Sequence, residues 1–149
     1  MTRKKLPIGI QTFAKIREDN HYYVDKTPFA LRLIEQGTHF FLSRPRRFGK
    51  SLFLDTLKEL FEANAALFEG LYAETRWDWS VRHPVLRFSF GGGVLGSLAD
   101  LGQSLDRQLT VLEQQHGLSA DFPDARSRFA ELIRRLHEQT GQRVVILVD

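Results

Sequence analysis

The sequence predicts a three-layer α/β domain built around a parallel sheet. Three short apolar runs, at 39–42, 84–90 and 144–148, are typical of strands. Between them lie longer segments in which apolar residues recur at helical spacing. Because strands that alternate with amphipathic helices pack as layers on a sheet, this order indicates the α/β class.

Four segments carry the helical pattern. In the first, Thr27 is expected to be the N-cap and Pro28 to lie in the first turn, as prolines often do. Glycines that follow three of the segments are expected to be C-terminal caps. The expected helices are 27–37, 49–61, 98–117 and 129–141.

The last apolar run, 144–148, is unbroken and mostly β-branched. Such a run suits a central parallel strand that is covered on both faces. A strand of this kind seldom forms a natural C-terminus, because the chain must leave the sheet and cover it. We therefore expect a sheet that is incomplete at the C-terminus, in a piece of a longer protein.

Composition limits the classes of protein. With 149 residues, 42% hydrophobic and 26% charged, the chain has the size and balance of one globular domain. Without cysteine it has no disulfide and no thiolate metal site, which suits a reducing cytoplasm. The net charge of +3 argues against a strongly basic nucleic-acid binder. No apolar run approaches the length of a membrane span.

A phosphate-binding loop is predicted in the stretch FLSRPRRFGKSLFLDTL, residues 41–57. The motif G-x-x-x-x-G-K-[ST] is met except at its first glycine, where Arg44 stands. Amides at a helix start are unpaired and can bind phosphate oxygens, and Gly49 leaves them accessible. Lys50 is expected to reach the β- and γ-phosphates, and Ser51 to bind Mg²⁺.

The expected nucleotide contacts of this loop are Arg44, Pro45, Arg46, Arg47, Phe48, Gly49, Lys50, Ser51 and Leu52. The three arginines leave two interpretations open. They form a solvated basic loop, or one of them supplements Lys50 at the γ-phosphate, where charge develops during transfer.

Asp149 follows the run 144–148 and gives a Walker B pattern. A hydrolytic nucleoside triphosphatase needs such an acid at the end of a neighbouring strand to hold the hydration shell of Mg²⁺. Many buried strands also end in an acid that caps a helix or meets solvent. Lys50 and Asp149 are the predicted catalytic residues, and Ser51 and Asp149 the predicted metal ligands.

The segments YYVDKT (22–27) and RPRRFGKS (44–51), with HPVLRFSFG and RVVILVD, resemble the predicted AAA-ATPase-like family of bacterial proteins. The likeness runs from about Leu6 to Asp149, and the family's own loop has arginine in the first-glycine position. The resemblance implies an AAA/STAND-like P-loop domain that uses ATP and Mg²⁺, of which residues 1–149 are the N-terminal portion. It also implies that later segments supply a catalytic glutamate, sensors and often a PD-(D/E)xK nuclease-like domain.

In such modules, a segment like 22–25 often lies against adenine, so Tyr23 is a predicted base contact. The alternative is that the tyrosines pack into the core, while Asp25 or Thr27 caps a helix.

Three functions stay open on the sequence. The first is an ATPase that hydrolyses ATP when whole, while this portion binds it without efficient turnover. The second is a nucleotide-gated interaction switch. The third is a nucleic-acid module that uses Arg44, Arg46, Arg47 and Lys50 on phosphates and Phe48 on a base. The expected partners are nucleotide and, through the full-length protein, nucleic acid; no membrane is expected, and the oligomeric state is left open.

Overall fold

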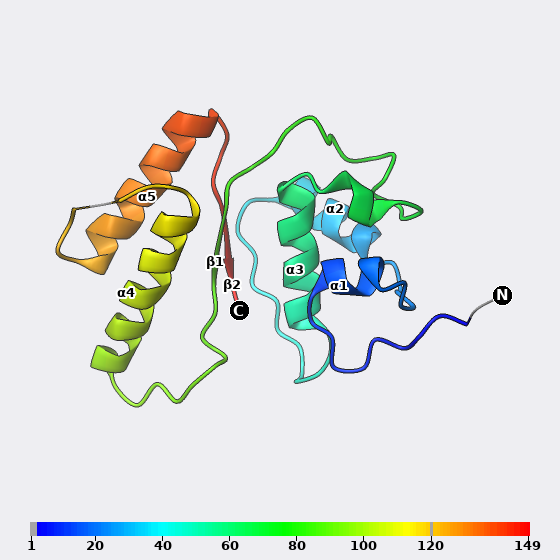
Figure 1. Ribbon diagram of the computed structural model, residues 1–149, viewed down its shortest axis with the longest axis horizontal. Helices are drawn as coiled ribbons and strands as arrows, with labels where there is room; N and C mark the ends of the chain where they lie inside the picture. Colours follow the sequence, from blue (N-terminus) through cyan, green and yellow to red (C-terminus); the bar gives the residue numbers. More distant parts are fainter. Residues whose placement is uncertain (1–2, 120) are drawn as a thin grey trace. The chain divides into compact units, whose positions relative to one another are not determined.

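The computed structural model describes residues 3–119 and 121–149 and confirms the α/β class (Figure 1). The chain divides into two compact units, Met1–Arg82 and His83–Asp149, which we call the first and the second unit. The elements of the first unit are α1 (Phe13–Glu18), α2 (Thr27–Gln36), α3 (Lys50–Phe61) and the 3₁₀ helix η1 (Ala65–Phe68). Those of the second are β1 (Val85–Phe88), α4 (Leu98–Gln115), α5 (Ala125–Thr140) and β2 (Val145–Val148).

The first unit is held together around the short helix α1, whose apolar residues Phe13 and Ile16 are fully buried. The ring of Phe13 packs against those of Phe68 and Tyr23, with centroid distances of 4.9 and 5.2 Å. Its backbone N–H donates a 2.7 Å hydrogen bond to Oδ2 of the buried Asp55. This carboxylate satisfies an amide at the helix start, which has no acceptor within its own helix.

The second unit is a β-α-α-β arrangement with two parallel strands (Figure 1). Leu86 and Phe88 of β1 pack against apolar residues of α4 and α5. The two helices are also joined by Arg128, whose guanidinium forms hydrogen bonds of 3.1 and 3.0 Å with Glu113. The buried core of this unit consists of Leu86, Phe88, Leu109, Leu112, Leu132 and Leu136.

Most helix boundaries agree with the sequence, with local corrections. Gly141 ends α5 in the left-handed conformation, as its capping role requires. The last helix begins earlier than expected, because the side chain of Asp124 accepts from the amide of Ser127 and caps it. Thr27 is the first residue of α2 and not its N-cap. Instead, Asp25 Oδ1 accepts from the Thr27 amide and hydroxyl, at 2.9 and 2.7 Å.

The prediction of a buried strand at 39–42, all of them described residues, is wrong. No strand forms there, and Phe41 is 93% exposed. A strand needs a neighbour that supplies backbone hydrogen bonds, and in the described residues the sheet contains only β1 and β2.

The last strand forms, but the expectation that both of its faces are covered is wrong. Leu147 is buried, whereas Ile146 and Val148 are 42% and 58% exposed. Their register partners on β1, Leu86 and Phe88, are buried against α4 and α5. The helices therefore cover the β1 side of this face and leave the β2 side open. A three-layer P-loop arrangement stays a prediction.

Candidate nucleotide site

The predicted phosphate loop leads directly into α3. Gly49 is the N-cap residue, with φ of 76°, a left-handed conformation that glycine adopts without strain. Arg47 is also left-handed, with φ of 66°. Two such residues bend the chain sharply just before Lys50, and helix geometry leaves the first-turn amides without acceptors in their own helix. The partial positive charge of a helix start therefore lies at this loop.

Lys50 closes the loop on itself. Its Nζ donates a 2.5 Å hydrogen bond to the backbone carbonyl of Arg44. The position where the general motif has glycine thus supplies a main-chain oxygen, which a residue of any type can provide. The side chains of Arg44, Arg46 and Arg47 are exposed, and Ser51 is half-buried.

A cavity of about 500 Å³ brings this loop together with the segment 22–26. Three cations line it, namely Lys26, Arg44 and Lys50, and none of the described lining residues is acidic. The rest of its wall is largely aromatic and aliphatic. The remaining lining residues are Leu6, Pro7, Ile16, Tyr22, Tyr23, Val24, Phe29, Leu42, Phe48, Gly49, Leu52, Phe53 and Thr56.

The two tyrosines of this wall differ. The ring of Tyr23 meets Phe13 edge-on, and burial, the main influence, raises the pKa of its hydroxyl. Hydrogen bonds from the Lys26 backbone and the Thr56 side chain act in the opposite direction. Tyr22 is 50% exposed and presents more of its ring. Tyr23 therefore has the packing role that the sequence left open, and its contact with a base stays a prediction.

Asp25 has a structural role in the first unit. Besides capping α2, its Oδ2 accepts a 2.7 Å hydrogen bond from the amide of Tyr72. The neighbouring Thr27 Oγ1 accepts from the amide of Ala73 at 3.1 Å. The segment 22–27 thus combines anchoring residues with residues that line the cavity.

Several lining residues were not predicted from the sequence, among them Lys26, Phe29 and Phe53, whereas Tyr22 belongs to the segment 22–25 that was expected to lie against adenine. Tyr22 and Lys26 lie in the segment YYVDKT, which was a usable signal. Phe29 and Phe53 were expected only as apolar helix positions, and helical spacing cannot tell which of these face a cavity.

Asp149 lies at the carboxyl end of β2, as predicted. Its backbone continues the pairing of the strands, with the Asp149 amide donating to Phe88 O and the Phe90 amide donating to Asp149 O, both at 2.9 Å. Its side chain forms an ion pair with Arg87 of β1, at 3.6 Å. Lys50 and Ser51 belong to the first unit and Asp149 to the second, so their convergence on one metal ion stays a prediction.

Within residues 3–119 and 121–149, no three histidine or acidic side chains form a cluster that could hold a metal. Mg²⁺ needs no such cluster, since it keeps several waters and commonly binds one or two carboxylates plus substrate phosphates. No helix in the described ranges is long and apolar enough to cross a bilayer.

The comparison with family models gives the decisive finding. The model of the family described as predicted AAA-ATPase matches residues 7–149. The chain belongs to this predicted AAA-ATPase family. The resemblance carried by YYVDKT and RPRRFGKS is therefore confirmed. Membership of a predicted ATPase family also supports nucleotide binding in general terms.

A curated relative extends this finding. It is described as an uncharacterized protein in the vnfD 5′ region of Azotobacter chroococcum mcd 1. It is 65% identical over 150 residues, which cover the whole of this chain and 29% of the relative. The chain thus spans less than a third of that protein's length. No solved structure matches the chain.

Proposed function

We propose that this AAA-ATPase family member binds ATP with Mg²⁺ in the cavity of the first unit. The observation that carries the proposal is the lining of that cavity, which combines aromatic side chains with three cations and includes the loop before α3. A nucleoside triphosphate has the matching chemistry, because a flat base and a polyanionic tail are joined in one molecule.

At the phosphate end, the loop 44–52 and the start of α3 would hold the triphosphate. The amides of a helix start and the ammonium of Lys50 are donors suited to phosphate oxygens. Lys50 would exchange its bond with the Arg44 carbonyl, a neutral acceptor, for one with an anionic oxygen. In the present bond only Lys50 is charged, whereas both partners of the new bond would be charged, so the new bond would be stronger and this exchange favours binding. Ser51 would be the ligand of Mg²⁺ on this loop.

At the base end, Tyr22 and Tyr23 line the wall formed by the segment 22–26. Aromatic rings stack on a base through their faces, and Tyr22 has the more exposed ring. Tyr23, which is packed on Phe13, would contribute an edge of the wall and keep its neighbour in place.

Hydrolysis belongs to the proposal for the whole protein. Lys50 would neutralise charge on the β- and γ-phosphates and Asp149 would hold metal-bound water, while other segments of a longer protein would supply the further residues. A switch that binds ATP without turnover uses the same cavity, so binding is the common property to test first.

The test is a titration of the chain with a fluorescent ATP analogue in the presence and absence of Mg²⁺. Saturable, Mg²⁺-dependent binding is expected. Lys50→Ala should weaken binding by about tenfold to a hundredfold, because this is the change in affinity that corresponds to the free energy of a hydrogen bond to a charged group. The matched control is Lys15→Ala, because Lys15 is exposed on α1 and does not line the cavity. Equal binding by wild type and Lys50→Ala would refute the proposal.

A further inference from the structure

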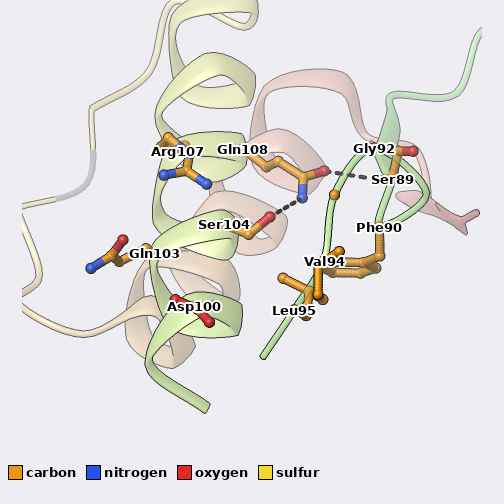
Figure 2. A pocket seen from close by; sticks show the side chains of 11 residues that line it. Ser89, Phe90, Gly92, Val94, Leu95, Asp100, Gln103, Ser104, Arg107 and Gln108 are labelled. Atoms are coloured by element: carbon orange, nitrogen blue, oxygen red, sulfur yellow. Dashed lines mark hydrogen bonds between the residues drawn. The ribbon is translucent and has the colours of Figure 1, made fainter. Parts of the chain in front are cut away.

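The second unit contains a cavity of about 490 Å³ that the proposed nucleotide site does not use (Figure 2). It lies past the carboxyl end of β1, between the segment 89–95 and the first turns of α4. In open α/β sheets, ligands bind at the carboxyl ends of the strands. This cavity therefore occupies a position where a ligand site is expected from sheet geometry alone.

One wall of the cavity is fixed by hydrogen bonds. Gln108 of α4 accepts from the Ser89 amide through Oε1 at 2.8 Å and donates from Nε2 to Ser104 Oγ at 3.2 Å (Figure 2). In the first turn of α4, Asp100 Oδ2 accepts from the amide of Gly96 at 3.1 Å. These bonds connect both ends of the segment 89–96 to α4.

The cavity lining contains one cation, the exposed Arg107, whose guanidinium forms no hydrogen bond or ion pair with any described residue. Its planar guanidinium matches a carboxylate or a phosphate group with two parallel hydrogen bonds. The backbone of the lining segment is open at Gly92 and Gly93, since a Cβ at either position would meet no atom within 4 Å.

The other side chains of the cavity restrict the charge and polarity of the rest of the ligand. Asp100 precedes Arg107 by seven residues on α4, roughly 10 Å along a helix axis, so anions are repelled from its end of the cavity. Phe90, Val94 and Leu95 form an apolar wall (Figure 2). Val94 is 96% exposed, which leaves its surface available to a ligand.

We propose that this cavity binds a small organic anion, whose carboxylate or phosphate group lies on Arg107 and whose apolar body lies against Phe90, Val94 and Leu95. The proposal is independent of ATP binding in the first unit. It assigns the second unit a ligand site of its own, at the same sheet edge as Asp149.

The probes are 3-phenylpropionate and phenyl phosphate, with 3-phenylpropan-1-ol as the neutral analogue. Each is titrated into the complete ¹⁵N-labelled chain while amide NMR shifts are followed. Saturable shifts are expected in the segment 89–95 for the anions, and at least tenfold weaker binding for the alcohol. The stronger of the two anions identifies the ligand class as carboxylate or phosphate ester.

Arg107→Gln should weaken binding of the anions at least tenfold, whereas Arg126→Gln should leave it unchanged. Arg126 is an exposed arginine of α5 that does not line the cavity. Val94→Asp, at an exposed position, should also weaken binding because it places a negative charge beside the site. Lys50→Ala should leave these shifts intact, which separates this result from the ATP test.

Absence of saturable shifts, or equal binding of the alcohol, would overturn the proposal. So would Arg107→Gln and Val94→Asp variants that bind the anions as wild type does.

Discussion

Single carboxylates organise the first unit. Asp25 caps α2 and holds the amide of Tyr72, while the buried Asp55 holds the amide of Phe13 at the start of α1. Each connects segments more than forty residues apart through a backbone donor. The bond to Phe13 is buried, and a buried amide without an acceptor is destabilising, so Asp55 contributes to stability as a hydrogen-bond acceptor.

Asp55→Ala is expected to destabilise the chain by about 1–3 kcal/mol, because the buried Phe13 amide loses its acceptor. Urea denaturation measures this free energy. Asp55→Asn, which keeps a carbonyl oxygen at the same place, should cost less. An alanine variant as stable as wild type would show that this hydrogen bond contributes nothing.

Tyr23 predicts a pH dependence of stability. Burial raises the pKa of its hydroxyl above the ordinary value of 10.0, so the folded state favours the neutral form. The unfolded chain releases this proton first as pH rises. The stability that the neutral Tyr23 hydroxyl contributes is therefore fully present below pH 10.0, and it is lost as pH rises through the folded-state pKa. Tyr23→Phe should show a smaller fall in unfolding free energy between about pH 9 and pH 11 than wild type, measured by urea denaturation. An identical fall would contradict the assignment to Tyr23.

At the scale of elements, the start of α3 determines where the phosphate loop can act. The helix begins at Lys50 because Gly49 turns the chain through a left-handed conformation. A Cβ at Gly49 would meet no atom within 4 Å, so its requirement for glycine comes from backbone conformation and not from crowding.

Gly49→Ala should therefore destabilise the chain by about 1–2 kcal/mol, the energy of a left-handed alanine. Gly102→Ala is the matched control, since Gly102 lies inside α4 and a Cβ there also meets no atom within 4 Å. It should stabilise by about 0.5–1 kcal/mol, because alanine is the better helix former. Thermal denaturation of both variants checks the opposite signs, and a shift of the same sign in both would contradict this explanation.

At the scale of the whole molecule, positive charge is concentrated in one short loop. The net charge is only +3, while Arg44, Arg46, Arg47 and Lys50 lie within seven residues. Under the proposed function this cluster serves one nucleotide and not an extended backbone of phosphates.

Single-stranded DNA is accordingly expected to bind weakly at physiological salt, while Mg²⁺·ATP raises the melting temperature of the chain. Fluorescence anisotropy over a salt series and thermal denaturation with and without ATP measure the two effects. Tight DNA binding that falls steeply with salt, without thermal stabilisation by ATP, would instead favour the nucleic-acid module.

By itself the sequence determined the α/β class, the family, the start of α3 at the Gly-Lys-Ser motif and the strand before Asp149. These features depend on local periodicity, on glycine conformation and on motifs that neighbouring residues specify. The sequence left open whether Asp25 or Thr27 caps α2, and the structure shows that the Asp25 side chain binds the first amide of the helix. Only the tertiary structure decided that 39–42 forms no strand. The same holds for the exposed side of β2. The family resemblance already implied that segment 22–25 and the phosphate loop serve one nucleotide, and the structure adds the single cavity that both of them line. Strand pairing, burial and cavities depend on residues far apart in the chain, whose contacts no local pattern encodes.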